Sequence, residues 1–249
     1  MNSAPAIFRQ WTRTAAGLLW PARCAACDDP LDDRATPGFC RTCASAARPV
    51  TAPFCAICAE PFQGEITSSF SCPNCLGRRQ QFDFAVAAWL SRGPVRTAIH
   101  HFKYGRRLAL REPLAQLLAT GLADPRIAAR SDWLLVPVPL HPRRFREREF
   151  NQSEELARSL ARLSGLPFAR VLRRTRYTST QAALRREDRL GNLKGAFALR
   201  WRAPRLTAGR AILLIDDVLT TGSTANACSA VLRKAGGAEQ IAVLTVARG

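Results

Sequence analysis

The chain has 249 residues, enough for one large domain or two smaller ones, and a formal net charge of +18. No apolar run reaches the roughly 18 residues that a membrane-spanning helix needs, so we expect no membrane span. Of its 37 basic residues only three are lysine, which leaves 34 arginines. This excess fits a partner rich in phosphate, such as a nucleotide or nucleic acid, and equally an arginine-rich bias from a GC-rich genome.

The first 20 residues carry a short amphipathic pattern. Apolar residues recur at helical spacing at Ile7, Trp11, Ala15 and Leu18, with arginines between them. The pattern favours a helix that docks on the protein over one that lies on a membrane surface. Its apolar segment is too short for a secretory signal, so we expect a cytoplasmic protein.

Eight of the nine cysteines form four C-x-x-C pairs, separated by 12, 11 and 13 residues. Four such pairs are typical of zinc binding; disulfides suit secreted domains, and a redox motif would explain only one pair. The ninth cysteine, Cys228, shares a helical face with apolar residues, and we expect it to be buried. The pairs are Cys24/Cys27, Cys40/Cys43, Cys55/Cys58 and Cys72/Cys75.

The cysteine pairs belong to an internal repeat of about 31 residues. CAACDDPL at residues 24–31 and CAICAEPF at residues 55–62 share one pattern, and a second pair follows each at a similar interval. The repeat predicts two closed, structural zinc sites. A cross-braced arrangement, which joins the first pair to the third, is the alternative. The sequential sets are Cys24, Cys27, Cys40 and Cys43, and Cys55, Cys58, Cys72 and Cys75.

The composition changes after Cys75, which predicts an N-terminal helix and ribbon domain over residues 1–80 and a second domain over residues 81–249. Strand and helix patterns alternate beyond that boundary, as in α/β proteins. We expect strands at Phe82–Leu90 and Trp133–Val138, and helices at Pro94–Tyr104 and Leu108–Leu122.

An arginine-rich segment follows the second of these strands. We expect a loop there, which either receives a phosphate-bearing group or is simply a solvated basic loop. Asn151 and Glu154 then have the spacing of a helix N-cap and the third helical position, so Asn151 needs no catalytic explanation. The arginines are Arg143, Arg144, Arg146 and Arg148.

The stretch ILLIDDVLTTGST, residues 212–224, is the strongest functional signal. Ala211 to Ile215 has no polar alternation, which predicts a parallel strand covered on both faces. Asp216 and Asp217 follow it at the edge where open α/β sheets bind ligands. Each residue alone would suit an ordinary strand–helix turn. Together, Thr220, Thr221, Gly222, Ser223 and Thr224 predict a phosphate cradle at a helix N-terminus.

This stretch matches the motif with which type I phosphoribosyltransferases bind 5-phosphoribosyl-1-pyrophosphate (PRPP). Four further stretches extend the resemblance over nearly the whole chain. The chain resembles the ComF/GntX family, phosphoribosyltransferase-like proteins associated with competence and DNA uptake. The resemblance implies a type I phosphoribosyltransferase fold, a parallel sheet flanked by helices, with a small N-terminal zinc-ribbon domain. The further stretches are the cysteine ribbons, HHFKYGRR, PVPLHPRRFREREFNQ and TSTQAALRREDRLGNLKGAF.

The resemblance also implies roles for residues. Asp216 and Asp217, the catalytic pair, would bind the ribose hydroxyls, and Thr220–Thr224 the 5-phosphate. Arg143 and Arg144 would belong to the pyrophosphate loop, with Mg²⁺ bridging pyrophosphate and ribose oxygens. The segment from Arg173 to Gly195 would form a mobile hood. Lys103 and Arg106 are further candidates for ligand contact.

The chain departs from the family pattern R-x-R-G-F-N-Q, because Glu149 stands in the glycine position. A glycine there would serve a positive φ angle or a close backbone approach, and a carboxylate would repel pyrophosphate. The departure puts the pyrophosphate assignment in doubt.

Three functions follow as hypotheses. The first is an active phosphoribosyltransferase whose acceptor the sequence does not identify. The second is a non-catalytic PRPP-binding sensor or docking module of the DNA-uptake machinery. The third is a single-stranded nucleic-acid binder that uses its zinc ribbons and arginines as the contact surface. A homo-oligomer is compatible with all three, and we place DNA uptake above any one reaction.

Overall fold

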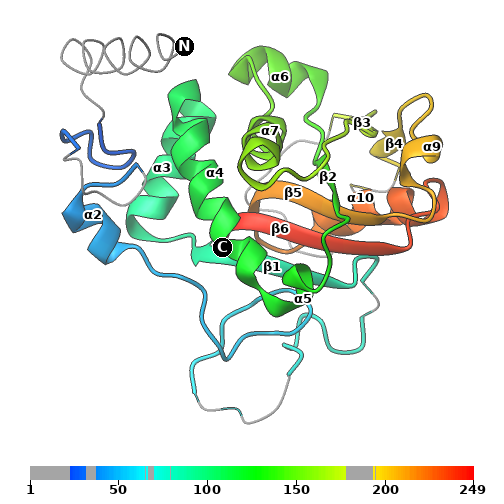
Figure 1. Ribbon diagram of the computed structural model, residues 1–249, viewed down its shortest axis with the longest axis horizontal. Coiled ribbons are helices and arrows are strands. Elements are labelled where there is room, and N and C mark those ends of the chain that lie inside the picture. Colours follow the sequence, from blue (N-terminus) through cyan, green and yellow to red (C-terminus); the bar gives the residue numbers. More distant parts are fainter. Residues whose placement is uncertain are drawn as a thin grey trace, which may run out of the picture.

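A four-stranded parallel sheet with strand order β1-β6-β5-β2 forms the centre of the molecule (Figure 1). The computed structural model describes residues 23–31, 38–64, 66, 70–78, 80–177, 193 and 195–249. The sheet and its covering helices confirm the predicted α/β class. The strands are β1 (Phe84–Leu90), β2 (Leu134–Pro137), β5 (Ala211–Leu219) and β6 (Gln240–Arg248), and a separate antiparallel pair joins β3 (Leu172–Arg174) to β4 (Phe197–Leu199).

The two faces of the sheet pack into two different hydrophobic cores. Side chains such as Leu213 and Leu244 contact one group of helices, and their neighbours Ile212 and Val243 contact the other side. Cys228 is buried in the second core, as predicted. The first core includes α3 (Gly93–Tyr104), α4 (Arg111–Ala119), α5 (Pro125–Ala128) and α7 (Gln152–Ser164); the second includes α10 (Ser223–Lys234), β3 and β4.

Several predicted elements have different bounds in the structure. The expected strand Phe82–Leu90 begins at Phe84, and the expected helix Leu108–Leu122 is divided into η1 (Leu108–Leu110), α4 and η2 (Thr120–Ala123). The strand expected to end at Ile215 continues through both aspartates to Leu219. The N-terminal helix and most of the hood segment lie outside the described residues.

The arginine-rich segment, expected to be a loop, is the helix α6 (Pro142–Arg148). Pro142 occupies its first turn, where its fixed φ angle suits a helix start and its missing N–H is not needed. The ring nitrogen Nδ1 of His141 accepts a hydrogen bond from the backbone N–H of Arg143 at 3.2 Å. Arginine has a good helix propensity, and the His141 cap at one end and the left-handed Glu149 at the other fix the ends of this short helix.

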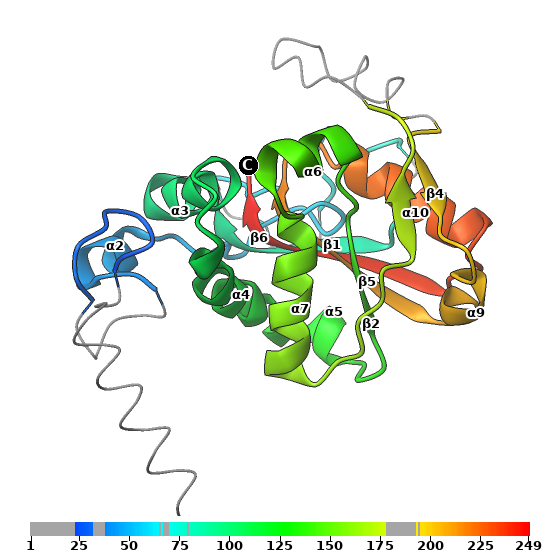
Figure 2. The same cartoon turned by 90° about the horizontal axis from the view of Figure 1, so that it is seen from above.

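The first ribbon packs against helices α3 and α4. Cys24 and Phe39 are buried in the core that these helices share, and the short α2 (Arg41–Ala46) lies beside them (Figure 2). Gly38 has φ +77°, and a Cβ atom there would lie 2.2 Å from the Cβ of Pro113. Glycine is therefore required both by the backbone conformation and by the close contact.

The second ribbon and the segment that precedes it cover the outer edge of β1. The N–H of Ala85 donates to the carbonyl of Ile57 at 2.8 Å, and the N–H of Val50 donates to the carbonyl of Ala88 at 3.0 Å. These bonds satisfy backbone groups that an edge strand would otherwise expose. The second ribbon therefore completes the sheet edge as well as holding a cysteine cluster.

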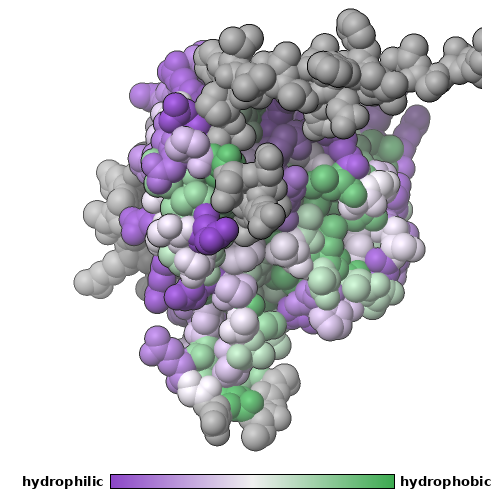
Figure 3. Space-filling view, turned by 60° about the vertical axis from the view of Figure 1, so that its left-hand side comes forward, coloured by the Kyte–Doolittle hydropathy of each residue, from purple (hydrophilic) through white to green (hydrophobic). Residues whose placement is uncertain are grey.

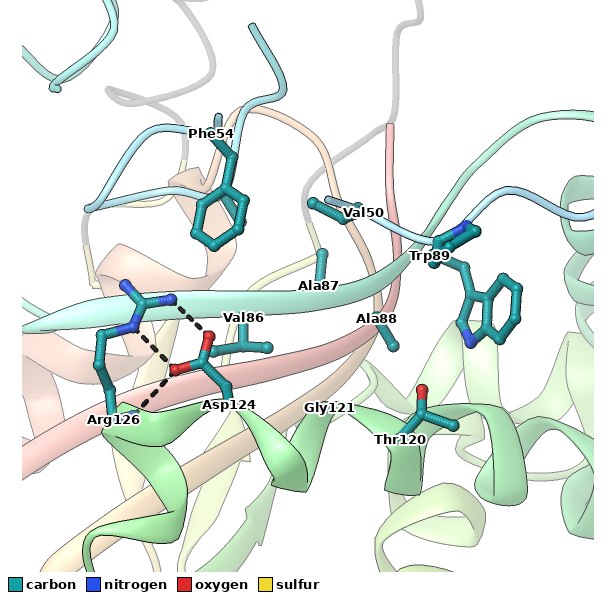
Figure 4. Close-up of a pocket in the computed structure, with 12 residues that line it drawn as sticks. Val50, Phe54, Val86, Ala87, Ala88, Trp89, Thr120, Gly121, Asp124 and Arg126 are labelled. Carbon is teal, nitrogen blue, oxygen red and sulfur yellow. Dashed lines mark hydrogen bonds and ion pairs between the residues drawn. The ribbon is translucent and has the colours of Figure 1, made fainter. Parts of the chain in front are cut away.

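A largely apolar pocket of about 290 Å³ lies where this ribbon meets β1 and η2 (Figure 4). Arg126 and Asp124 lie at one end of it, and Trp89 lies at the other. The guanidinium of Arg126 bonds both carboxylate oxygens of Asp124, at 2.9 and 2.8 Å, and donates to the carbonyl of Ala56 at 2.7 Å. These bonds tie the ribbon to the helix layer.

The surface in Figure 3 is largely hydrophilic, with hydrophobic residues between the polar ones. Among the described helices, none has the length and apolar character needed to cross a bilayer.

Candidate ligand site and cysteine clusters

Three elements bring polar side chains together around the acid pair on β5. The hydroxyl of Ser153, in the first turn of α7, donates to Oδ1 of Asp216 at 2.8 Å. The same oxygen accepts the backbone N–H of Asp217 at 2.9 Å. Lys103, in the last turn of α3, places its Nζ 2.8 Å from Oδ1 of Asp217. A polar cluster therefore forms near the carboxyl end of the sheet.

The acid pair carries more negative charge than its neighbours balance. Burial, followed by the charge of Asp217, raises the pKa of Asp216 to about 6, although Ser153 and Lys103 oppose the shift. Among the described residues, Lys103 is the one ammonium group in direct contact with the pair, through Asp217, while Arg174 interacts with Asp216 through its charge. Two neighbouring carboxylates, one of them with a raised pKa, suit a divalent cation or hydroxyl donors.

The loop after β5 begins helix α10. Gly222 is its N-cap with φ 74°, a conformation that favours glycine. The hydroxyls of Thr221 and Ser223 lie 2.9 Å apart, and Thr220 is exposed beside them. Thr224 lies in the first helical turn. The predicted cradle residues therefore gather at the N-terminus of a twelve-residue helix, which favours anions.

The two arginines expected at the pyrophosphate lie in different surroundings. Arg143 packs over the ring of Tyr177, 4.7 Å from its centroid, and pairs with Glu147 at 3.5 Å. Arg144 lies near Arg174 of β3. Burial is the main cause that lowers the pKa of Arg174, and the positive charge of Arg144 is the second. The negative charge of Asp216 opposes the shift. The charges of both Arg144 and Asp216 thus act on Arg174, whereas Arg143 contacts Tyr177 and Glu147.

Sequence reasoning missed Ser153 and Arg174 as site residues. Arg174 lay inside the expected hood segment and carried no motif of its own. Ser153 follows Asn151 and Gln152, and all three are buried at a helix start, where capping residues are ordinarily exposed. This polar run was the available signal. Asn151 occupies the N-cap position, but its amide donates to the carbonyl of Val138 at 3.0 Å and makes no cap hydrogen bond.

Glu149 takes the positive φ angle that a glycine would favour. It ends α6 with φ 70°, and its N–H donates to the carbonyl of Phe145 at 2.6 Å. Its carboxylate pairs with Arg106 at 2.5 Å. The position is therefore left-handed, as the glycine argument predicted, and the carboxylate charge expected to repel a ligand is already paired with a cation.

The cysteines form the two predicted clusters. Within each cluster the four sulfur atoms all lie within 4.8 Å of one another. The Cys27–Cys40 and Cys58–Cys72 sulfur pairs are each 3.6 Å apart, close to the roughly 3.8 Å that Zn–S bonds of about 2.3 Å give in a tetrahedron. All nine cysteines are free of disulfides. The sequential pairing is confirmed, the cross-braced alternative is wrong, and the clusters are consistent with two structural zinc ions.

The two clusters repeat one backbone design. The N–H of Cys24 donates to the carbonyl of Asp29, and the N–H of Cys55 to that of Glu60, both at 2.8 Å. Although burial opposes it, backbone N–H groups lower the pKa of Cys24 to about 6 and that of Cys55 to about 7. Each ribbon therefore favours a thiolate, the form that binds zinc, at its first cysteine, whereas burial first of all raises the pKa of Cys43 and Cys58 to about 11.

The clusters differ in their surroundings. Cys27 in the first is exposed, whereas all four cysteines of the second are buried. Arg248, at the end of β6 and 6% exposed, donates to the carbonyl of Cys58 at 3.1 Å and lies 3.9 Å from its sulfur. It also pairs with Glu60. A buried guanidinium thus lies against the second cluster.

Comparisons with known proteins agree with these features. The double zinc ribbon domain model matches residues 15–76. Competence protein F of Haemophilus influenzae is 33% identical over 217 residues, which cover 85% of this chain and 90% of that protein. DNA utilization protein YhgH of Escherichia coli K12 is 32% identical over 231 residues, which cover 90% and 96% respectively.

Two more distant matches are shorter. Competence protein ComFC of Streptococcus pneumoniae is 30% identical over 135 residues, 54% of this chain and 55% of that protein. A solved structure of the allosteric regulatory enzyme of purine biosynthesis has a TM-score of 0.36 and 19% identity, over 55% of this chain and 25% of that one. Because the Haemophilus and Escherichia proteins match over at least 90% of their length, the chain belongs to the ComF family, with a double zinc ribbon at its N-terminal side.

Proposed function

We propose that this protein binds PRPP together with Mg²⁺ at the acid pair and the adjoining loop. The observation that carries the proposal is the contact of Lys103 and Ser153 with the two carboxylates, next to a hydroxyl-rich helix start. The site thus offers carboxylate acceptors on one side and hydroxyl and N–H donors on the other. PRPP carries sugar hydroxyls that suit the carboxylates and a phosphate that suits the hydroxyl and N–H donors.

The loop supports binding of the 5-phosphate. The first backbone N–H groups of α10 have no partner within the helix, and that of Ser223 donates only a long bond of 3.4 Å to the hydroxyl of Thr221; the helix start also carries the positive end of a helix dipole. Gly222 allows the backbone to turn without a side chain over the loop. The hydroxyls of Thr221 and Ser223 add donors that can rotate toward phosphate oxygens.

The acid pair supports binding of the ribose and of Mg²⁺. Carboxylates accept hydrogen bonds from sugar hydroxyls, and Asp216 and Asp217 are the residues that would hold the ion. Mg²⁺ is usually bound through one or two carboxylates plus substrate phosphates, and the surplus charge at the pair fits it. When bound, Mg²⁺ neutralises charge on pyrophosphate.

The same site would allow phosphoribosyl transfer. In that reaction an acceptor displaces pyrophosphate from C1 of PRPP, and catalysis rests on positioning and charge stabilisation. Arg144 and Arg174 supply positive charge on the side of α6 and β3. The relatives are named for competence and for DNA utilization, so we place this chemistry, or ligand sensing without chemistry, in the uptake or use of DNA.

Calorimetric titration of PRPP with and without Mg²⁺ tests the proposal. We expect Mg²⁺-dependent binding, and at least a tenfold weaker affinity for Asp217→Asn because a ligand carboxylate is lost. The matched control is Asp132→Asn, since Asp132 is an exposed carboxylate paired with Arg130. If the unaltered protein shows no Mg²⁺-dependent binding, the proposal is wrong. If binding is found, release of pyrophosphate in the presence of an acceptor would indicate an enzyme, and binding without release would indicate a sensor.

A further inference from the structure

A basic, aromatic surface lies around the turn that follows β4. Trp201, in the turn after β4, is 91% exposed. It lines a groove of about 720 Å³ that contains four arginines and no acidic residue. The groove is lined by Arg173, Leu199, Arg200, Trp201, Arg202, Pro204 and Arg205.

The turn that carries Trp201 is anchored on both sides. The backbone N–H of Arg200 donates to the carbonyl of Val171 at 2.8 Å, and its Nε donates to the carbonyl of Leu172 at 3.2 Å. Ala203 is 2% exposed and bonds back to the carbonyl of Arg200 at 3.1 Å. The indole therefore projects from a fixed base. A single exposed apolar residue is ordinary, so the arginines around it decide the interpretation.

The basic surface continues toward α6. Arg173 and Arg200 also line a second groove of about 170 Å³, which reaches Phe145 and Arg170. Phe145 is 48% exposed. The acid in this groove, Glu154, is already paired with Arg158 and Arg170. Figure 1 shows β3 and β4 between α6 and α9 (Pro204–Thr207), in agreement with a surface shared by these elements.

We propose that the Trp201 surface, defined as Arg173, Arg200, Trp201, Arg202 and Arg205, binds single-stranded nucleic acid. Bases stack on an exposed indole, and guanidinium groups contact the phosphates on either side. Bases within a duplex are stacked on each other and cannot use the indole in this way. The partner is therefore a single strand, held at a site separate from the acid pair and from the zinc ribbons.

Substitution of Trp201 tests the stacking. Full-length protein with both zinc sites filled is titrated into a fluorescein-labelled oligo(dT), and anisotropy is followed. We expect Trp201→Ala to weaken binding about tenfold, and Trp201→Phe to retain most of the affinity because a ring remains. Neither change alters the net charge. Unchanged binding by Trp201→Ala would overturn the proposal. Labelled oligo(rU) and a duplex of equal length distinguish DNA, RNA and paired strands, and tighter binding of the duplex would also contradict it.

A pair of charge reversals tests the location. The double variant Arg202→Glu/Arg205→Glu is compared with the double variant Arg41→Glu/Arg78→Glu. The second variant changes the net charge by the same amount, but its substitutions lie on the two ribbons. We expect the first pair to lose at least thirtyfold in affinity and to flatten the salt dependence by about 1.4 in logarithmic slope, at about 0.7 per phosphate contact. The ribbon pair should lose less than threefold. Equal losses would show that binding follows net charge alone and would overturn the proposed site.

Two further measurements keep this result separate from PRPP binding. Zinc content and thermal unfolding show that each variant is folded. Trp201→Ala should bind PRPP as the unaltered protein does, and Asp217→Asn should bind oligo(dT) with unchanged affinity. Failure of PRPP binding with retained DNA binding would reject the proposed function alone. Loss of DNA binding in Asp217→Asn would contradict a separate surface.

Discussion

The second cysteine cluster and the acid pair both concentrate negative charge inside the protein, but the fold balances them differently. Four thiolates around one Zn²⁺ carry a formal charge of about −2. Arg248, a buried guanidinium, lies against this cluster. At the acid pair, Lys103 contacts Asp217, and the pKa of Asp216 stays raised to about 6.

The difference separates a structural site from a ligand site. At the cluster, four sulfur ligands would complete the tetrahedral coordination of one ion, and Arg248 reduces the remaining negative charge, so no position is open for a further partner. At the acid pair, burial and the neighbouring carboxylate still disfavour the charged form of Asp216 despite these contacts, so a proton or another cation would stabilise the pair further. Buried titratable groups with unbalanced charge are enriched at functional sites for this reason. The comparison therefore predicts opposite stability effects when charge is removed from each place.

Loss of a thiol in the buried cluster should have the largest effect. We expect Cys58→Ser to remove one zinc ion and to destabilise the protein by roughly 4 kcal/mol or more, because metal binding there is coupled to folding. Cys27→Ser, its counterpart in the repeat, should also remove one zinc ion but destabilise less, since Cys27 is exposed. Zinc analysis and urea unfolding measure both. Equal destabilisation by the two variants would break the distinction between the clusters.

Removal of the guanidinium should have the next largest effect. Arg248→Met leaves the charge of the cluster unbalanced and breaks the pairing with Glu60, so we expect a loss of about 3 kcal/mol. A chelator should then extract the second zinc ion faster than the first. Arg158→Met is the control, because its pair with Glu154 is on the surface and should change stability by less than about 1 kcal/mol. Unaltered zinc release in Arg248→Met would refute charge compensation.

At the acid pair, removing charge should stabilise the protein. The pKa of Asp216 is raised from its ordinary value of 3.8 to about 6, so the folded protein binds this proton more tightly than the unfolded chain does. Stability is therefore lost as pH rises through about 4 to 6 and stays lower above pH 6. Asn cannot ionise, so we expect Asp216→Asn to gain about 1–3 kcal/mol at pH 7 and nothing below pH 4. Urea midpoints between pH 4 and 8 measure this.

The same variant should bind PRPP more weakly, since a carboxylate that would hold Mg²⁺ and ribose is gone. Stability and ligand affinity would then change in opposite directions, as expected of a functional site. A lower stability of Asp216→Asn at pH 7 would show that Ser153 and the backbone N–H already satisfy the carboxylate fully.

The sequence predicted correctly those features that form within one continuous segment of the chain. The 31-residue repeat identified both cysteine clusters, because each cluster takes its four cysteines from one continuous segment. The apolar run before Asp216 identified β5. The site itself depends on residues from distant segments: Ser153 reaches Asp216 because α7 packs against β5, and Arg174 of β3 interacts with Asp216 through its charge. The arginines of α6 were expected in a loop because charge says little about helix formation when no apolar stripe is present.

The smallest predicted effect concerns backbone strain near the ligand site. Glu149→Gly relieves a left-handed conformation worth roughly 1 kcal/mol and removes the exposed ion pair with Arg106, worth less than about 1 kcal/mol. We therefore expect a net gain of about 0.5 kcal/mol in urea unfolding. Ala59→Gly in the second ribbon is the matched control: its φ is 56°, but it also loses a buried methyl group, so we expect no net change. If Ala59→Gly raised the free energy of unfolding and Glu149→Gly did not, the removable backbone strain would lie in the second ribbon and the prediction would be wrong.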